Sequence, residues 1–536
     1  MNSKNLLSLL AGLILVTTGN AQSKNDPLPY TPGPFEPSWK SLKEGYKFPD
    51  WYRDAKFGIW AHWGPQSQAE FGDWYGRNLY IVGHKQNKYH LETFGHPSEF
   101  GFKDLCNAWK AAKFDPDALL ATYKAAGAKY FVALANHHDN FDMWNSKYQP
   151  WNAVNVGPKR DIIGGWAEAT AKAGLRFGVS IHASSAWTWF EVAQLSDSEG
   201  PRKGIPYDGN VTKADGVGKW WEGMDPQDLY TQYGHKISPM VLNRKEALRN
   251  PGEPPTKAYV RKYYDRVRDV VSTYKPDLVY FDDSRMPLNE FVGLRIVADI
   301  YNQNIARNSG KNEAVVNTKR LKDDQTKALV YDFEVGVPKG LLPDPWQVDA
   351  CIGAWHYLKG AKYKRADQVV RALADVVSKN GNLLLSIPLR GEGTLDDQGK
   401  QVLAGVGAWL SQNGEAIYGT RPWTRFGEGP SSEADIPEIA KGGIPLYQKA
   451  PYTSKDIRFT TRGTTLYAIV MNLPADGRVT VRALASSEPA KITKVELLGF
   501  KGELRHRRTA EGLEVEMPAK PPGEIAYVLK IEGAAK

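Results

Sequence analysis

The chain has 536 residues, of which 42% are hydrophobic and 24% are charged. These fractions are typical of globular proteins and exclude wholesale disorder and a collagen-like structure. The net charge is +9, but acidic and basic residues alternate along most of the chain and basic runs are short, so we expect no nucleic-acid role. Seventeen Trp and 26 Tyr residues favour a ligand with one apolar face and one polar edge.

Residues 1–21 predict a cleavable secretory signal peptide. Lys4 gives a basic start, residues 6–16 form an apolar run, and residues 19–21 offer the small side chains that a signal peptidase recognises. The apolar run is too short to cross a bilayer, which takes about 20 residues, and no later run is long enough. We therefore expect an exported protein, periplasmic or extracellular, with no membrane span.

Residues 22–50 predict an irregular lead-in, and residues 51–423 predict a (β/α)8-type TIM barrel, an α/β fold. In the second range short apolar runs, each bounded by polar residues, Gly or Pro, alternate with helical patterns, as in strands that are buried on both faces. The predicted strands are 57–64, 129–139, 176–184, 277–283, 313–318, 328–334, 349–357 and 382–388. The clearest predicted helices are 119–128, 166–175 and 259–276, which end in Gly or Pro.

A long insert, residues 195–256, follows the third predicted strand. Its aromatic residues favour an ordered lid or a substrate wall over a disordered loop. From 424 to 536 apolar and polar residues alternate between turn signals, which predicts an antiparallel β-sandwich after the barrel.

Cys106 and Cys351 are the two cysteines, so one disulfide at most is possible. Each lies in an apolar stretch, which favours buried free thiols, although the sequence leaves their pairing open. We expect a stability that does not depend on an oxidising compartment.

Barrel enzymes place their active sites at the carboxyl ends of the strands, and polar and aromatic residues gather there in this chain. Imidazoles, indoles and a carboxylate on one rim predict a pocket for a sugar. The predicted binding residues are Trp60, His62, Asp73, Trp74, His137, His138, His182, Lys319 and Trp355. For about half of the Trp and Tyr residues, a place in the core is the alternative.

A metal site is the alternative role for these histidines. We predict none, because the spacing lacks a His-x3-5-His pattern and the adjacent His137 and His138 should face opposite sides of a strand.

Hydrolysis of a glycoside needs two carboxylates. Asp282 ends the fourth predicted strand and Glu334 the sixth, so both should reach the same rim. Asp283 competes with Asp282, since alternation turns one of the two inward and the other away.

Several segments in order resemble glycoside hydrolase family 29, the α-L-fucosidases. They are KFGIWAHWGPQS (56–67), DWYGRNLY (73–80), NHHDNFDMWNSKY (136–148), GPKRDIIGG (157–165), DLVYFDD (277–283), SKNGNLLLSIP (378–388) and NGEAIYGTRPW (413–423). The stretch 456–472 is similar to that family's C-terminal sandwich. The resemblance implies a retaining double displacement, exo-action on a terminal sugar, and neither metal nor cofactor.

By this resemblance Asp282 is the nucleophile, and His62, His137, His138 and Trp74 hold the sugar. His182 stands where the family often has Tyr. The assignment of Glu334 as acid/base rests on its strand-end position and on a Glu-x-Gly pattern of relatives.

The chain also departs from the family pattern. Asp73 replaces a Glu, Gln347 the Glu of a Pro-Trp-Glu segment, Lys319 an Arg, and His356 the Gly of a Trp-Gly-Tyr segment. Since Gln cannot donate a proton as an acid does, an acid/base at position 347 would be lost.

The leading hypothesis is an exported retaining exo-glycosidase that removes terminal α-L-fucosyl or closely related residues from glycans. The alternatives are an exo-galactosidase-type activity in a modified pocket and a non-catalytic sugar-binding protein of the same fold. We expect the sandwich to pack on the barrel rather than to act as an independent carbohydrate-binding module. The sequence leaves the linkage, the aglycone and the oligomeric state open.

Overall fold

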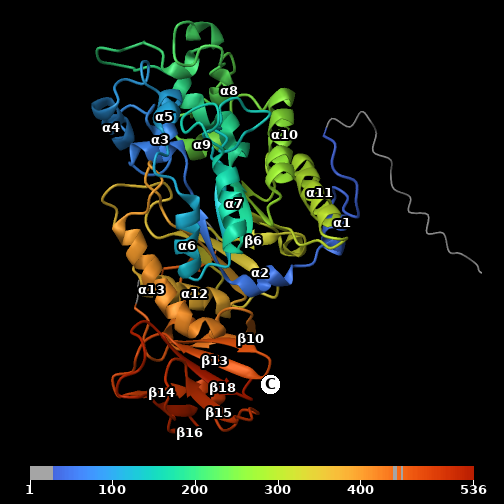
Figure 1. The fold of residues 1–536 in the computed structure, drawn as a ribbon, viewed down its shortest axis with the longest axis vertical. Coiled ribbons are helices and arrows are strands. Elements are labelled where there is room, and N and C mark those ends of the chain that lie inside the picture. Colours follow the sequence, from blue (N-terminus) through green and yellow to red (C-terminus); the bar gives the residue numbers. More distant parts are fainter. Residues whose placement is uncertain (1–27, 439–442, 448–450, 536) are drawn as a thin grey trace, which may run out of the picture.

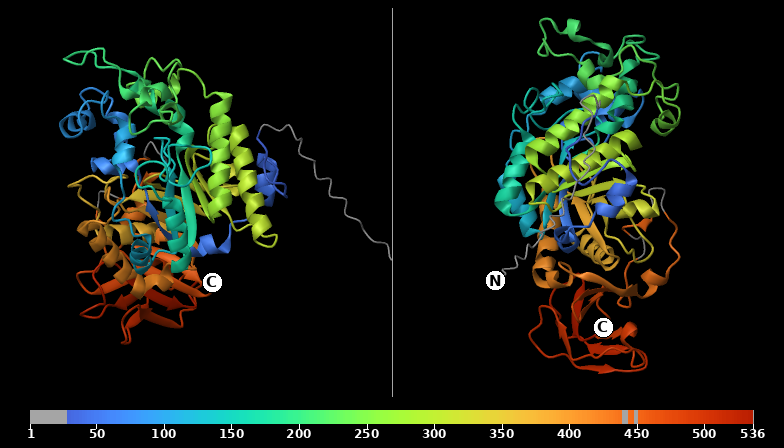
Figure 2. Two further views of the ribbon diagram at one scale, coloured as in Figure 1. Left: turned by 45° about the horizontal axis from the view of Figure 1, so that its top comes forward. Right: turned by 90° about the vertical axis from the view of Figure 1, so that its right-hand side faces the viewer.

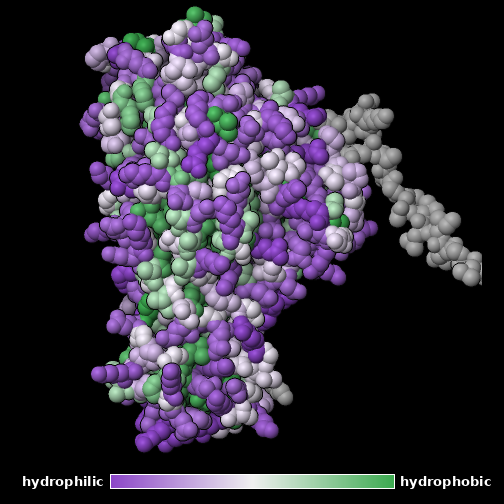
Figure 3. Space-filling view, in the orientation of Figure 1, coloured by the Kyte–Doolittle hydropathy of each residue, from purple (hydrophilic) through white to green (hydrophobic). Residues whose placement is uncertain are grey.

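The structure, a computed structural model, describes residues 28–438, 443–447 and 451–535. The predicted signal peptide lies outside these residues. The barrel occupies most of the molecule, and the sandwich lies at one end of it (Figure 1). The surface facing the viewer is mainly hydrophilic, with apolar groups scattered among the charged ones (Figure 3).

Eight parallel strands close into a barrel in the order β1-β2-β3-β4-β5-β6-β8-β9, which confirms the predicted (β/α)8 class. The pairing of β1 with β9 closes the sheet. Most strand residues are buried, as a barrel covered by helices requires. The strands are β1 Phe57–Ala61, β2 Tyr130–Asn136, β3 Arg176–Ile181, β4 Leu278–Ser284, β5 Val315–Lys319, β6 Val330–Asp332, β8 Trp346–Cys351 and β9 Gly381–Ser386.

Helices surround this barrel, and side-chain caps precede several of them. Asp115 and Asp161 accept hydrogen bonds from the first turns of α6 and α7, and Gly174 ends α7 at a φ of 68°. The longer helices are α6 Pro116–Ala125, α7 Ile162–Ala173, α10 Lys257–Tyr274, α11 Glu290–Arg307, α12 Ala366–Ser378 and α13 Asp397–Asn413. The shorter ones are α1 Trp39–Gly45, α2 Asp50–Ala55, α3 Tyr75–Asn78, α4 Lys85–Thr93, α5 Phe102–Ala108, α8 Gln227–Tyr230, α9 Arg244–Arg249 and α14 Pro430–Glu433.

The seventh barrel strand differs from its prediction at 349–357, because β8 begins at Trp346 and ends at Cys351. The apolar pattern therefore continues past the strand into a loop that carries Trp355 and His356. The segment between β6 and β8, all of it described, holds no α-helix. A short strand there, β7 (Gly336–Val337), pairs with β11 (Ile444–Pro445) from the connector to the sandwich.

The insert 195–256 is ordered and caps the end of the barrel remote from the sandwich, where it is green in Figure 2. Its buried Asp208 accepts hydrogen bonds from Tyr80 and Tyr230, each at 2.6 Å, and pairs with Lys103 at 3.1 Å. Trp221 is buried, whereas Trp220 keeps 43% of its surface exposed. These aromatic residues therefore mainly anchor the cap on the barrel.

The C-terminal region forms two antiparallel sheets around an apolar core of its own, as predicted. The predicted strand within 456–473 is a hairpin, because Gly463 turns the chain at a φ of 59°. One sheet has the order β10-β12-β13-β18-β15, formed by Arg421–Glu428, Ile457–Arg462, Thr465–Val470, Tyr527–Glu532 and Lys494–Leu497. The other has the order β14-β17-β16, formed by Arg478–Val481, Leu513–Glu516 and His506–Arg508.

Cys106 and Cys351 are both free thiols. Among the described residues, no helix combines the length and apolar character needed to cross a membrane.

Candidate active site

Asp282 lies at the centre of the polar rim, near the end of β4. Its Oδ2 atom is 3.1 Å from His182 Nδ1 and 3.4 Å from His138 Nε2, and its Oδ1 atom contacts Lys319 Nζ. Burial alone would raise the pKa of Asp282, but Lys319 and His182 lower it well below its usual value. This carboxylate is therefore ionised and can attack an electrophilic carbon.

Glu334 contacts the same ammonium group, with Lys319 Nζ 2.9 Å from its Oε2 atom. Two oxygens that bind one nitrogen lie no further apart than two hydrogen-bond lengths, about 6 Å. Retaining glycosidases hold their two carboxyl groups about 5–5.5 Å apart, whereas inverting enzymes separate them by about 6.5–9.5 Å. The bridging Lys319 thus favours the retaining arrangement.

Asp283 points away from this pair, as strand alternation predicts. Its carboxylate accepts a hydrogen bond from Ser184, and burial raises its pKa to about 7. Asp282 is therefore the aspartate that faces His138 and Lys319.

His137 and His138 both face the polar rim, where they approach Asp73 and Asp282, and the expectation that they face opposite sides was wrong. β2 ends at Asn136, so neither histidine follows the alternation of the strand, and their ring centroids are 4.5 Å apart. Gln66 Nε2 donates to His137 Nδ1 at 2.8 Å and to Asp139 at 2.9 Å, which fixes the orientation of the amide. His137 therefore carries its proton on Nε2, since burial holds its pKa well below the usual value.

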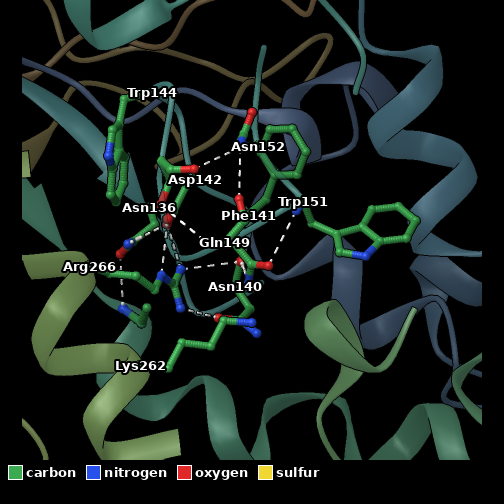
Figure 4. A network of polar contacts seen from close by, with 12 residues as sticks. Asn136, Asn140, Phe141, Asp142, Trp144, Gln149, Trp151, Asn152, Lys262 and Arg266 are labelled. Carbon is green, nitrogen blue, oxygen red and sulfur yellow. Dashed lines mark hydrogen bonds and ion pairs between the residues drawn. The ribbon is translucent and has the colours of Figure 1, made fainter. Parts of the chain in front are cut away.

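A buried polar network holds the turn that carries these histidines (Figure 4). Arg266 on α10 donates to Asp142 Oδ2 at 3.0 Å and to Asn140 Oδ1 at 2.6 Å. Asn136 donates to Asp142 at 3.0 Å, and its Oδ1 accepts from the backbone N–H of His182. One network thus sets the positions of the β2 and β3 ends together.

Aromatic rings form a corner beside Asp282. The Trp60 centroid lies 5.5 Å from those of Tyr280 and Trp355 and 5.7 Å from that of His182. Trp60 and Tyr280 are fully buried, so the half-buried Trp355 is the ring through which this corner can contact a ligand beside Asp282.

Trp74 and Trp189 form a second aromatic pair, 5.2 Å between centroids. Trp189 is buried and also packs on His138 at 4.8 Å, whereas Trp74 keeps 38% of its surface exposed, so Trp74 is the ring of this pair that solvent reaches. Trp189 is missing from the predicted binding residues. Trp187 lies only two residues before it, and the sequence does not indicate which of the two indoles faces the site.

His356 also joins the site, although it was predicted only as a departure from a family pattern. Its Nδ1 atom lies 2.6 Å from Asp73 Oδ1, and its ring centroid 4.5 Å from that of His62. The ligand atoms of His62, Asp73, His137 and His356 lie within 4.8 Å of one another, a spacing that a metal ion could use. However, the Nε2 proton of His137 suits a hydroxyl group better than a cation.

Gln347 lies in the barrel interior, deeper than the polar rim. It is fully buried and donates to Asp332 Oδ1 at 2.9 Å. On the same strand Asp349, two residues nearer the rim, is 4.0 Å from Lys319 Nζ. The side chain at position 347 therefore does not point at the place where Glu334 and Asp282 meet.

Glu334 lies just beyond β6, in a loop that the connector to the sandwich holds. The next residue, Val335, has a φ of 52°, an unfavourable conformation for a β-branched side chain. The backbone N–H of Val335 donates to Asp349 O at 2.9 Å, and its carbonyl accepts from Leu446 at 3.0 Å. These hydrogen bonds and the β7–β11 pairing keep the loop in place.

Comparisons with known proteins agree with this geometry. The family model described as "Alpha-L-fucosidase" matches residues 24–415, and the model described as "Alpha-L-fucosidase C-terminal domain" matches residues 449–532. The tissue alpha-L-fucosidase of Rattus norvegicus is 26% identical over 542 residues, which cover 97% of this chain and 96% of the relative. The alpha-L-fucosidase of Dictyostelium discoideum is 26% identical and covers 90% of this chain and 88% of its own.

Solved structures show the same similarity. The crystal structure of the alpha-fucosidase of Thermotoga maritima in complex with fucose has a TM-score of 0.67 and 25% identity, and covers 93% of this chain and 100% of that one. Another structure, an alpha-L-fucosidase, has a TM-score of 0.69 at 26% identity. Since the first family model spans most of the chain, and the barrel and sandwich follow in the same order, the chain belongs to the α-L-fucosidase family of glycoside hydrolases.

Proposed function

We propose that the protein is an exported retaining exo-α-L-fucosidase that removes terminal α-L-fucosyl residues from glycans. The observation that carries this proposal is the contact of Asp282 and Glu334 with one Lys319 ammonium, beside an aromatic corner. Export rests on residues 1–21, which have the pattern of a signal peptide.

The reaction proceeds in two displacements. Asp282 attacks C1 of the fucosyl group while Glu334 gives its proton to the glycosidic oxygen; the C1–O bond to the aglycone breaks and an ester to Asp282 forms. Water then loses a proton to Glu334 and attacks C1, which breaks the ester and releases fucose. The two inversions together retain the configuration at C1.

The aromatic corner supports fucose over galactose. Fucose carries a methyl group where galactose carries a hydroxymethyl group, and a hydroxyl placed against Trp355 would lose its hydrogen bonds to water, because the buried Trp60 behind that ring offers no polar partner there. The histidines and Asp73 supply hydrogen bonds for the ring hydroxyls.

Gln347 gives no reason to propose a non-catalytic protein, because its side chain lies in the barrel interior. We therefore assign the acid/base role to Glu334.

The test is azide rescue of two variants with an aryl α-L-fucoside, read by NMR of the product. Asp282→Gly should lose several orders of magnitude in kcat, and azide should restore turnover with a β-L-fucosyl azide product, because azide replaces the nucleophile in one inversion. Glu334→Ala should also be rescued, but with an α-L-fucosyl azide product, because azide then attacks the ester of Asp282.

Asp283→Asn is the matched control, since this neighbour points away from Lys319, and it should keep most of the activity. Unchanged turnover of Asp282→Gly, or a β-L-fucosyl azide from Glu334→Ala, would contradict the assignments. Activity on α- or β-galactosides above that on the α-L-fucoside would contradict the substrate.

A further inference from the structure

Two loops from distant parts of the chain bring Asp73 and His356 together. His356 Nδ1 donates to Asp73 Oδ1 at 2.6 Å, between residues 283 positions apart. The His356 side chain is fully buried, whereas the Asp73 side chain keeps 21% of its surface exposed. The buried imidazole thus contacts the Asp73 carboxylate from the protein interior, while part of the carboxylate stays exposed.

A hydrogen-bond donor faces the same carboxylate. His137 Nε2, which carries a proton because Gln66 donates to Nδ1, lies 4.0 Å from Asp73 Oδ1. This distance is too long for a direct hydrogen bond, yet a hydroxyl oxygen can lie about 2.8 Å from each atom. Such a hydroxyl would accept from His137 and donate to Asp73, which satisfies both groups.

We propose that His356 is a positioning residue for sugar recognition: it holds Asp73, one of the predicted binding residues, where Asp73 and His137 can share one ring hydroxyl of the terminal sugar. This inference rests on the proposed exo-fucosidase function. It assigns to His356 a role in sugar recognition that acts through Asp73 and leaves the chemistry of Asp282 unchanged.

The packing around His356 explains why an aspartate fits here. The imidazole fills the space between Asp73 and the rings of His62 and His137, whose centroids are 4.5 and 5.0 Å away. A glutamate at position 73 would push one more methylene group into this filled space. Removal of the imidazole would make room for it, so the two positions should tolerate change only together.

The first experiment compares variants of His356 with an aryl α-L-fucoside. His356→Asn keeps a nitrogen donor near Asp73 and should stay within a few-fold of the wild-type kcat/KM. His356→Leu keeps the volume but loses the donor, and should lose roughly 10- to 100-fold in kcat/KM, mostly through KM. Melting temperatures report whether each variant is folded.

The second experiment is a rescue. Asp73→Glu and His356→Gly should each reduce kcat/KM, and the double variant should recover at least tenfold over the weaker single one. Additive losses in a folded double variant would show that the two side chains act independently and would overturn the inference.

The third experiment identifies the hydroxyl with aryl α-L-fucosides deoxygenated at C2, C3 or C4. The kcat/KM of the wild type should fall most on one of these three substrates. On that substrate His356→Leu should cause little further loss of kcat/KM. On the other two substrates the loss from His356→Leu should add to the loss from deoxygenation. Equal additivity on all three would overturn the inference. Absence of wild-type activity on the parent α-L-fucoside would instead refute the proposed function, so the two failures are distinguishable.

Discussion

At the scale of single residues, Lys319 determines the charge state of the candidate active site. Its ammonium contacts Asp282 and Glu334 and lies 4.0 Å from Asp349. Burial alone would lower the pKa of Lys319, but these carboxylates raise it well above its usual value. One buried cation therefore balances the charge of several carboxylates, and the ionised state of Asp282 depends on this cation.

Replacement of Lys319 by methionine should move the acidic limb of the kcat/KM profile to higher pH. The proposed nucleophile Asp282 must be ionised to attack, and Lys319 is the main cause that depresses its pKa, so loss of this cation should raise that pKa. Lys319→Arg keeps the charge and should leave the limb nearly in place. An acidic limb that stays unmoved in Lys319→Met would show that the histidines alone hold Asp282 ionised.

The sequence predicts some of these residues better than others. Strand alternation separates Asp282 from Asp283, because both lie within β4. Glu334 and His356 lie beyond the ends of β6 and β8, where no periodicity indicates the direction of a side chain. For the same reason the pattern failed for His137 and His138, which follow the last residue of β2.

At the scale of elements, the insert 195–256 contributes to the candidate site through its neighbour, the 3-10 helix η2 (Ala183–Gln194). This helix precedes the insert and carries Trp189. Arg244, in the insert, lies over the Trp189 ring at 5.4 Å and donates to Thr188 Oγ1 at 2.8 Å. The predicted substrate wall is thus formed indirectly: the insert supports η2, and η2 presents the indole. Composition indicated an ordered insert, but the contact depends on tertiary packing that composition does not specify.

Arg244→Ala should therefore weaken substrate binding more than chemistry. We expect a rise in KM of roughly tenfold, with kcat changed by less than about threefold, because Trp189 loses its support while Asp282 keeps its contacts. Arg249→Ala is the matched control, since its side chain is 72% exposed and, within the described part of the chain, its ion pair is the one with Glu246 on the same helix. Equal effects of the two variants would contradict this role of Arg244.

At the scale of the whole molecule, the barrel and the sandwich share buried charges. Arg458 on β12 and Lys379 both pair with Asp375 on α12, and all three side chains are almost fully buried. Trp409 on α13 donates to Ala526 O at 2.9 Å across the same interface. The order of the two domains could be predicted from the change of periodicity near 424, but this interface could not, since its partners lie far apart in sequence.

Asp375→Ala should destabilise the protein by about 3–5 kcal/mol, because it leaves two buried cations without their counter-charge. Calorimetry should show one transition for the wild type and a lower Tm for the variant. Glu514→Ala removes a partner of the 70% exposed Arg507 and should cost less than about 1 kcal/mol. Similar losses in both variants would show that the interface pair contributes little.

The strained Val335 has a consequence for how this protein can be rearranged. Leu446 hydrogen-bonds its carbonyl and β11 pairs with β7, so the connector residues 444–446 hold the loop of Glu334 although they precede most of the sandwich. Suppose that the sandwich is replaced by that of a related protein. A junction at residue 424 would then also replace this connector, and the loop that carries Glu334, the proposed proton donor, would lose these contacts. A junction after Tyr447 would leave the connector intact, so the catalytic module extends about two dozen residues beyond the barrel that contains its chemistry.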